Sequence, residues 1–248
     1  MLSDPTTTIR SIVADDFRAA AVFEKHGIDF CCGGNRPIAD VCGEQGLDGR
    51  QIVADLEEAL ASEVDVPRFN SWDLDFLANY IVSNHHAYVR QAIDTIGAHT
   101  RKVADVHGGH HPEVKEIAAA FAAIAAEMAQ HMLKEERMLF PYIGQLAAAA
   151  RVRTAPSPAP FGSVANPIRM MEAEHQSAGD TMATIRRLSG DYTLPADACT
   201  TFKVTYQELQ AFEADLHRHV HLENNILFPK ALALERTLAE IVTPSSAP

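Results

Sequence analysis

The sequence predicts an all-α protein, in which a small helical unit precedes a four-helix bundle. Two observations favour this fold class. Apolar residues recur at alternating spacings of three and four along four long segments, which is the period of helices that bury one face. One helical motif also occurs twice, so the bundle is expected to consist of two related hairpins. A content of 47% hydrophobic and 22% charged residues fits a compact globular protein.

The chain is expected to divide into four parts: residues 1–62 as the small helical unit, 63–70 as a linker, 71–236 as the bundle and 237–248 as a flexible tail. In the first part, short helices are predicted after the threonine run, over 17–25, over 37–42 and over 49–60. Pro67 interrupts the helical pattern within the linker.

Four long helices are expected in the bundle. Ser71 is the predicted N-cap of the first, which runs to about residue 100. The second follows Pro112 and reaches Tyr142. The segment 147–163 is rich in alanine and proline and too long for a tight turn, which predicts a crossover connection. The third helix is expected from residue 166, with proline in its first turn, and the fourth over 198–228.

Charge and composition exclude several classes of partner. With 21 Lys+Arg against 33 Asp+Glu the formal net charge is -12, and no segment gathers enough basic residues to neutralise duplex phosphates. Nucleic acid is therefore not expected as a partner. No stretch is apolar enough for a signal peptide or a bilayer-spanning helix, so no membrane association and a cytoplasmic location are expected. The four cysteines are expected to be reduced thiols.

The repeated motif reads HMLKEERMLFP from residue 131 and HVHLENNILFP from residue 219, an offset of 88 residues. In each copy a histidine is followed four residues later by a glutamate, and then by Leu-Phe-Pro, which is expected to serve packing and to end the helix. A further histidine lies 45 residues before the first copy and 44 before the second. The six candidate residues are His86, His131, Glu135, His175, His219 and Glu223.

Periodicity places these polar side chains on buried faces. Along the second helix the expected seam is Ile117, Phe121, Ile124, Met128, His131, Glu135, Met138 and Tyr142. The other three helices carry equivalent seams through the remaining candidates. In the first helix, periodicity does not separate His85 from His86, since His85 also extends an apolar row through Ile81 and Tyr88.

Buried carboxylates of this kind indicate a metal site. A carboxylate among apolar side chains is costly unless it is paired or bound to metal, and no lysine or arginine lies on the same seams. Four imidazoles and two carboxylates suit two first-row metal ions, with two imidazoles on each ion and both glutamates bridging. By ligand type, zinc or manganese fits as well as iron. A single histidine in a core needs no metal to explain it. Because the His/Glu motif occurs twice with the same flanking residues, an interpretation without metal is the weaker one.

The chain resembles the iron-sulfur cluster repair di-iron family, which joins an N-terminal CCGG domain to a hemerythrin-like domain. The resemblance rests on VFEKHGIDFCCGGNRPIADVC at 22–42 and, in the bundle, on IVSNHHAYVR, HMLKEERMLFP, MEAEH, ACTTFK and LENNILFP. It implies a hemerythrin-like four-helix bundle with the six candidates as ligands, and it selects His86 over His85. It also implies a cofactor of two iron ions in a non-haem, oxo-bridged centre.

The same resemblance implies repair of iron-sulfur clusters damaged by nitrosative or oxidative stress, with iron donation as one route and damaged iron-sulfur proteins as partners. A non-enzymatic role is favoured. The alternatives are a di-iron enzyme that reacts with nitric oxide or oxygen, and a gas or redox sensor that acts through a partner. Oxygen storage is disfavoured, because oxygen carriers of this type use a histidine where this chain has Gly179. The sequence is compatible with a homodimer.

Cys31 and Cys32 precede the helix predicted from residue 37, and a helix N-terminus lowers the pKa of a nearby thiol. They are candidates for a redox-active or nitrosatable dithiol, or for a pair that hands on metal together with Cys42 or His26. The alternative is a glycine-flanked turn with inert thiols.

Several other residues carry weaker expectations. Cys199 is expected to be a small buried hydrophobe. The histidines at 107–111 are expected in a solvated loop, with His107 a candidate for assisting the uptake or release of iron. His217 and His221 flank a candidate ligand and are expected to be exposed or to support it.

Overall fold

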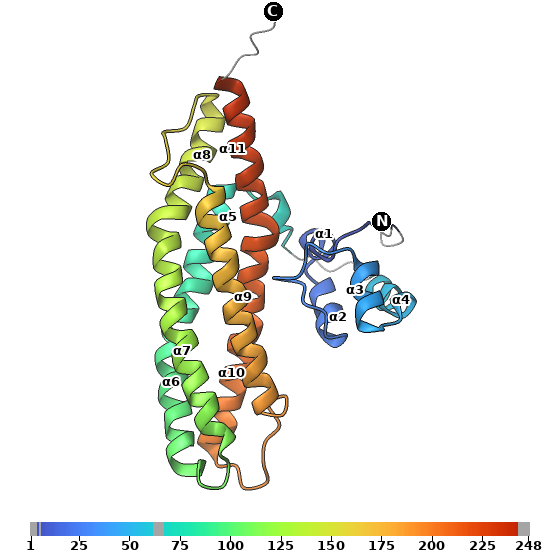
Figure 1. Ribbon diagram of the computed structural model, residues 1–248, viewed down its shortest axis with the longest axis vertical. Coiled ribbons are helices and arrows are strands. Elements are labelled where there is room, and N and C mark those ends of the chain that lie inside the picture. The colour runs from blue at the N-terminus through green and yellow to red at the C-terminus, as the bar shows by residue number, and fades with distance from the viewer. Residues whose placement is uncertain (1–3, 5, 62–66, 243–248) are drawn as a thin grey trace, which may run out of the picture.

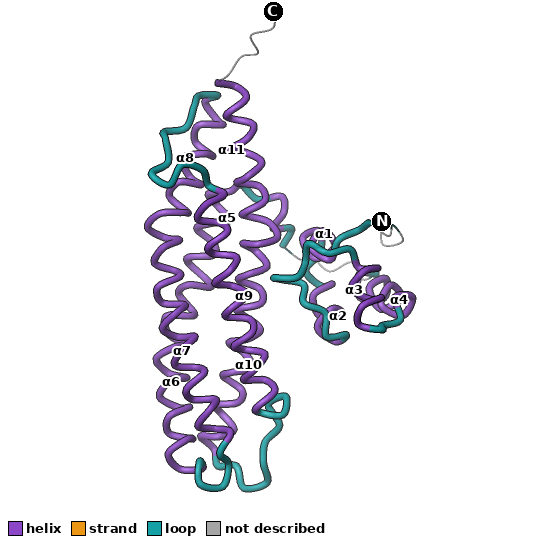
Figure 2. Tube along the Cα trace, viewed as in Figure 1, coloured by secondary structure: helices purple, strands orange, loops and turns teal. Residues whose placement is uncertain are grey.

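The structure is a computed structural model that describes residues 4, 6–61 and 67–242. Throughout that part of the chain the regular elements are helices, and outside them only two isolated β-bridges occur, Thr8 with Pro37 and Ala159 with Gly162 (Figure 2). The predicted all-α class is confirmed.

A small unit of short helices forms the N-terminal part, as the sequence predicts. Its helices are α1 (Ile9–Asp15), α2 (Ala19–Lys25), α3 (Ile38–Gln45) and α4 (Gly49–Leu60). The Thr8 hydroxyl accepts a hydrogen bond from the Ser11 amide at the start of α1, and Asp48 caps α4 through the Arg50 amide. Phe23, together with other apolar side chains of these helices, forms a fully buried core.

The second part is a bundle of four long helices, three of which contain a π-helical turn (Figure 1). The first long helix is α5 (Leu74–Ile81), a π-turn (Val82–His86) and α6 (Ala87–His107); the second is α7 (Glu113–Lys134), a π-turn (Glu135–Leu139) and α8 (Phe140–Val152); the third is α9 (Ala165–Leu188); and the fourth is α10 (Thr200–His221), a π-turn (Leu222–Leu227) and α11 (Phe228–Val242). Helix α6 packs against α7 and α10, and α7 packs against α9.

The π-turns correct two expectations. Met138 was predicted in the core seam, but it is 44% exposed, and Leu139 is buried in its place. A π-turn contains one residue more than an α-turn, so the following side chain rotates onto the buried face. The helices also continue past Pro141 and Pro229 instead of ending there. We attribute this to the same wider turns, which relieve the clash of a proline ring with the preceding turn.

The connection between α8 and α9 is not the crossover that composition suggested. Helix α8 extends to Val152, so the loop covers only 153–164, and it joins helices that are neighbours in the bundle. The loop is long because α8 and α11 project beyond the rest of the bundle, and the chain must fold back before α9 begins (Figure 1). Glu235 on α11 holds this loop by accepting hydrogen bonds from the Ser163 hydroxyl and the Val164 amide.

Helix ends near the predicted domain boundaries also differ from expectation. Asp73, not Ser71, is the N-cap residue of α5, and Ser71 ends a short 3-10 turn that begins at Phe69. Phe69 is buried against the bundle, so the end of the predicted linker belongs to the packed structure. The predicted flexible tail begins inside α11, which continues to Val242; residues 243–248 and part of the linker, 62–66, lie outside the described residues.

The N-terminal unit lies beside the middle of the bundle, with α1 and the loop between α2 and α3 nearest to it (Figure 1). Helix α1 contacts the π-turn of the fourth long helix. The rings of Phe17 and Phe30 pack against His221, and the Arg218 guanidinium lies over Phe17, 4.7 Å from the ring centroid. Among the described helices, none is both long and apolar enough to cross a membrane.

Candidate metal centre

The three π-turns lie where the candidate ligands lie. His86 ends the first π-turn, Glu135 begins the second, and Glu223 is the second residue of the third. Such turns are frequent at functional sites, because they redirect a side chain without ending the helix. They bring these residues to the same level of the bundle as His131, His175 and His219.

All six candidates are buried, with no side chain more than 2% exposed. They form two groups of four, and within each group one ligand atom from every residue lies within 4.8 Å of the others. The first group is His86, Glu135, His219 and Glu223, and the second is His131, Glu135, His175 and Glu223. Each group therefore takes its two histidines from different hairpins, and the two groups share both glutamates.

Distances within the first group are short enough for a common ion. His86 Nε2 lies 3.2 Å from His219 Nε2 and 3.3 Å from Glu135 Oε2. Glu223 Oε1 lies 3.0 Å from His219 Nε2. Two imidazole nitrogens and two carboxylates thus face one position.

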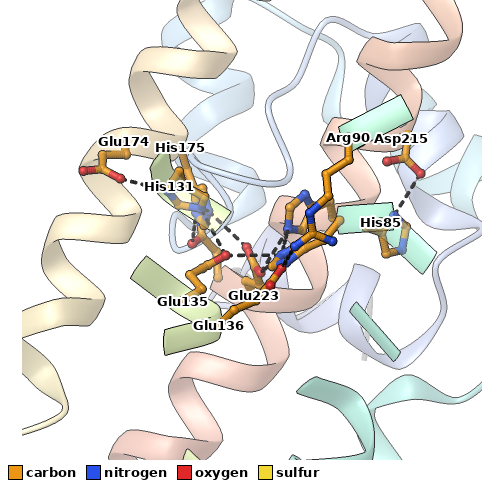
Figure 3. A network of polar contacts seen from close by, with 12 residues as sticks. His85, Arg90, His131, Glu135, Glu136, Glu174, His175, Asp215 and Glu223 are labelled. Atoms are coloured by element: carbon orange, nitrogen blue, oxygen red, sulfur yellow. Dashed lines mark hydrogen bonds and ion pairs between the residues drawn. The ribbon is translucent and has the colours of Figure 1, made fainter. Parts of the chain in front are cut away.

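The second group repeats this arrangement (Figure 3). His131 Nε2 lies 3.0 Å from His175 Nε2 and 3.3 Å from Glu135 Oε2. Glu223 Oε2 lies 3.0 Å from His175 Nε2. Since Glu135 and Glu223 take part in both groups, two ions, one in each group, would share both carboxylates.

Hydrogen bonds on the outer side of the imidazoles fix their orientation. His86 Nδ1–H donates to Glu136 Oε1 at 2.6 Å, and His131 Nδ1–H donates to Glu174 Oε2 at 2.9 Å. Each of these glutamates also pairs with a cation, Arg90 and Lys134 respectively. A proton on Nδ1 leaves a lone pair on Nε2, which is the form of histidine that binds metal.

His175 and His219 differ from this pattern. His175 Nδ1–H donates to the amide oxygen of Asn224 at 2.8 Å, so its partner is neutral. His219 Nδ1 is buried and has no hydrogen-bond partner in the described part of the chain.

The chemistry of this donor set fits a bound cation. Glu135 Oε1 is buried and has no hydrogen-bond partner in the described part of the chain, and the polar atoms nearest to Glu135 Oε2 and Glu223 Oε2 are imidazole Nε2 atoms of the two groups. Unsatisfied carboxylate oxygens in an apolar interior are costly, and a cation between them and the Nε2 lone pairs removes the cost. The residues present therefore fit a pair of metal ions.

Protons take the place of cations in the metal-free chain. Burial disfavours the charged form of His86, but hydrogen bonds to Glu135 and Glu223 outweigh it and raise its pKa to about 10. Burial also disfavours the charged form of His131, but the charges of Glu135 and Glu223, together with hydrogen bonds to Glu135 and Glu174, outweigh it and raise its pKa to about 9. The pKa of Glu223 lies well below its usual range, since His219 and the other imidazoles offset its burial. Burial lowers the pKa of His219.

His86, and not His85, lies with the other five candidates. His85 is also buried, but its Nδ1–H donates to Asp215 Oδ1 at 2.9 Å, and its ring stacks on that of His219. The phenylalanines of the two Leu-Phe-Pro segments pack as expected: Phe140 stacks on His86. Phe228 stacks on His175 in the same way, 6.1 Å between ring centroids.

A cavity of about 570 Å³ lies beside the second group, between α7 and α9. Its lining includes His131 together with the Lys134–Glu174 ion pair and the exposed side chain of Met170. Of the six candidates, His131 is the one that lines this cavity.

Cys31 and Cys32 lie together in the loop between α2 and α3, with 3.9 Å between their sulfurs. Asp29 holds this loop by accepting hydrogen bonds from the amides of residues 31, 32 and 33, and it forms a third potential ligand group with the two thiols. Hydrogen bonding with Cys32, together with burial, raises the pKa of Cys31 well above its usual value, opposite to the expected lowering. The two thiols lie seven and six residues before the first residue of α3, and no effect of that helix contributes to the pKa of Cys31.

Neither of the proposed partners joins this thiol pair. His26 pairs with Asp55 of α4 at 2.8 Å, and Cys42 is buried within the N-terminal unit. Among the described residues, Asp29 is the one that groups with the two thiols.

The remaining histidines have other partners. His221 is fully buried, not exposed, because the N-terminal unit covers it, and its Nδ1 accepts a hydrogen bond from Asn225 at 2.9 Å. His217 pairs with Glu24 of α2 at 3.1 Å. Both therefore contact the N-terminal unit and not the six candidates.

Cys199 is exposed, which corrects the expectation of a buried residue. It is the N-cap residue of α10, and its sulfur lies 3.2 Å from His107 Nε2. His111 pairs with Asp197 at 2.9 Å in the same region. This cluster is at the end of the bundle opposite to α8 and α11 (Figure 1).

Sequence reasoning missed the partners of the ligand histidines, Glu136, Glu174 and Asn224. A signal for them was present, because each is adjacent in sequence to a candidate ligand, Glu135, His175 or Glu223. Periodicity assigns such neighbours to another face of the helix and does not show that they reach a histidine of a different helix.

Comparison with known families divides the chain as the structure does. Residues 77–231 match the Hemerythrin HHE cation binding domain, and residues 5–60 match a Domain of Unknown function (DUF542). The bundle is thus of a cation-binding type, in agreement with its two buried His/Glu groups.

Curated relatives match along nearly the whole chain. The protein named iron-sulfur cluster repair protein YtfE of Musicola paradisiaca is 35% identical over 215 residues, which cover 87% of this chain and 91% of the relative. The proteins of the same name from Pectobacterium atrosepticum and Yersinia pseudotuberculosis are 34% and 33% identical, with the same coverage of both chains.

Proposed function

This chain belongs to the family of iron-sulfur cluster repair proteins, and we propose that it holds two iron ions and repairs iron-sulfur clusters damaged by nitrosative or oxidative stress. In this proposal the iron ions are bound by His86, His131, Glu135, His175, His219 and Glu223. The protein acts by giving up iron to a damaged cluster and not by turning over a small substrate.

The observation that carries the proposal is the sharing of Glu135 and Glu223 between two groups of histidines. Paired ions with bridging carboxylates in a four-helix bundle are the arrangement of di-iron carboxylate proteins. Two imidazoles and two carboxylates suit a divalent or trivalent first-row ion and leave coordination positions free. When bound, the iron pair would supply a store of exchangeable iron and open positions for nitric oxide or oxygen.

The chain's own residues set how firmly iron is held. Each ion position has only two imidazoles, and Gly179, one turn after His175, adds no further ligand. Buried apolar side chains exclude water from the site, whereas His131 lines a cavity. A site that is closed on most sides but has few strong ligands suits storage with controlled release.

The test is to incubate the iron-loaded protein with a dehydratase whose cluster has been damaged by nitric oxide. Activity of the dehydratase is expected to recover beyond that seen with the same amount of free iron, and iron in the donor should fall in parallel. A Glu135→Gln variant should fail, and Glu116→Gln, an exposed position on the same long helix, should work as the wild type does. Recovery equal to the free-iron control would overturn the proposal.

Metal analysis and Mössbauer spectroscopy of protein from iron-replete cells test the cofactor separately. Two irons per chain in a coupled pair are expected. A purified protein that contains zinc or manganese in preference to iron would contradict the cofactor assignment even if the fold is intact.

A further inference from the structure

Asn224 connects one candidate metal ligand to the loop that carries Cys31 and Cys32. Its amide oxygen accepts the hydrogen bond from His175 Nδ1–H at 2.8 Å, and its amide nitrogen donates to the backbone oxygen of Cys31 at 3.3 Å. Asn224 is 4% exposed and follows Glu223 directly in the π-turn. A single side chain therefore spans the distance from this loop to the metal centre.

The loop fits closely against this π-turn. Asn225 donates to the backbone oxygen of Phe30 at 2.9 Å, next to the bond made by Asn224. A Cβ atom on Gly34 would lie 2.5 Å from the Phe30 oxygen and 3.3 Å from Asn225 Oδ1, so only glycine allows this approach. The loop between α2 and α3 that carries the two thiols, here called the thiol loop, extends from the N-terminal unit toward the bundle in Figure 1, in agreement with these hydrogen bonds.

The partner of His175 differs in kind from those of His86 and His131. Glu136 and Glu174 are carboxylates held by Arg90 and Lys134 of the bundle, whereas Asn224 is neutral and is oriented by a different part of the protein. The orientation of His175 thus depends on the position of the thiol loop.

The two thiols and Asp29 form one potential ligand group, with their ligand atoms within 4.8 Å of one another. The Cys31 side chain is buried and its sulfur contacts Asp29 Oδ1 at 3.3 Å, while Cys32 is partly exposed. Asp29 also accepts hydrogen bonds from the amides of residues 31–33. An ion that replaces the contact between Cys31 and Asp29 therefore acts on the same turn whose Cys31 oxygen accepts a hydrogen bond from Asn224.

We propose that Asn224 is a positioning residue that couples the loop of Cys31 and Cys32 to the metal centre. When a thiophilic cation binds the two thiols, the ion between His131 and His175 is bound more weakly. This inference rests on the proposed function, since it assumes that the two groups bind metal. The ion between His86 and His219 is unaffected in the first instance, because neither of its histidines contacts Asn224. Loss of an outer hydrogen bond to a ligand histidine typically costs roughly 10- to 100-fold in metal affinity.

The experiment measures release of iron(II) from the reduced, iron-loaded protein to a coloured chelator. The probe is phenylarsine oxide, which condenses with two neighbouring thiols and releases water, without oxidation or reduction. In the wild type, the probe should speed release of one of the two ions by roughly 10- to 100-fold. A double variant, Cys31→Ser with Cys32→Ser, should release iron at the basal rate whether or not the probe is present.

Two variants of Asn224 distinguish an effect on the orientation of His175 from a general loss of packing around the metal centre. Asn224→Ala should release one ion faster without the probe, because His175 loses its partner. Asn224→Asp keeps an acceptor for His175, as Glu136 and Glu174 provide elsewhere, but it cannot donate to the Cys31 oxygen. The probe should therefore no longer change the rate at which this variant releases iron.

Asn225→Ala is the matched control, since Asn225 holds the same loop but does not contact a ligand histidine. Its basal release should rise less than that of Asn224→Ala, because His175 keeps its acceptor. Faster basal release in Asn225→Ala than in Asn224→Ala, or an Asn224→Asp variant that still responds to the probe, would overturn the inference. If the wild type binds no iron pair, the proposed function fails; if it binds two and the probe has no effect, only this inference fails.

Discussion

Glu135 and Glu223 each lie between two histidines of different helices. Glu135 Oε2 is 3.3 Å from Nε2 of both His86 and His131, and Glu223 is 3.0 Å from both His175 and His219. The two glutamates occupy equivalent places in the repeated motif, 88 residues apart. Neither ion position is complete without both of them, so the pair is expected to act as one unit.

Replacing Glu135 by glutamine should weaken both ion positions together. An amide has no negative charge to offset two cations, so affinity should fall by more than the roughly 10- to 100-fold typical of losing an outer hydrogen bond. Metal analysis after dialysis against a chelator measures this. Glu116→Gln, exposed on the same long helix, is the control, and retention of two ions by Glu135→Gln would contradict the shared-ligand geometry.

Adjacent histidines in the first π-turn should respond differently to substitution. His86→Gln is expected to lose metal, whereas His85→Gln should keep two ions, because His85 bonds to Asp215 outside the two groups. The second variant should instead lose about 1 kcal/mol of unfolding free energy, as expected for one hydrogen bond. Metal content and thermal unfolding of both proteins distinguish the roles. Equal loss of metal in the two variants would show that His85 also acts at the centre.

The outer partners Glu136 and Glu174 should act on different ions. Glu136→Ala removes the acceptor of His86 Nδ1–H, and Glu174→Ala removes that of His131. Each variant should show one ion released roughly 10- to 100-fold faster and one released at the usual rate. Stopped-flow release to a chelator resolves the two phases. A single fast phase for both ions in either variant would indicate that the positions are not independent.

Metal uptake should depend on pH through His86 and His131. Their pKa values in the metal-free chain, about 10 and about 9, mean that both are protonated near neutral pH and must lose protons when metal binds. Apparent affinity should therefore rise with pH up to that range. Calorimetric titration in buffers of different ionisation enthalpy measures the released protons, and a binding heat that is the same in all buffers would contradict this.

The same shifts predict the stability of the metal-free protein. Because both folded-state pKa values exceed the ordinary histidine value of 6.5, their contribution is complete below that pH and is lost as pH rises through about 9 to 10. The melting temperature of the metal-free chain should fall over that window. Gln variants of both histidines should flatten the curve, and an unchanged wild-type melting temperature from neutral to alkaline pH would count against the raised values.

Much of the centre could be predicted because the motif repeats and the helical period is regular. The period put Glu135 and Glu223 on buried faces, and the burial of both agrees with it. It failed at Met138, because the extra residue of a π-turn shifts the register of everything after it, and local sequence carries no clear sign of that residue. The expectation that Cys199 is a small buried hydrophobe was also wrong, because its exposure depends on how the end of the bundle is closed.

The sequence by itself determined the helical hairpins, five of the inward-facing polar residues and the cation-binding character of the bundle, because these follow from local period and from the cost of burying charge. The period left His85 and His86 unseparated, and the structure placed His86 with the other five. Tertiary structure alone decided that His86 pairs with His219 and His131 with His175, since each pair joins different hairpins. It also placed the thiol loop against Asn224. Contacts between distant segments depend on how packed faces meet, and no local pattern encodes that.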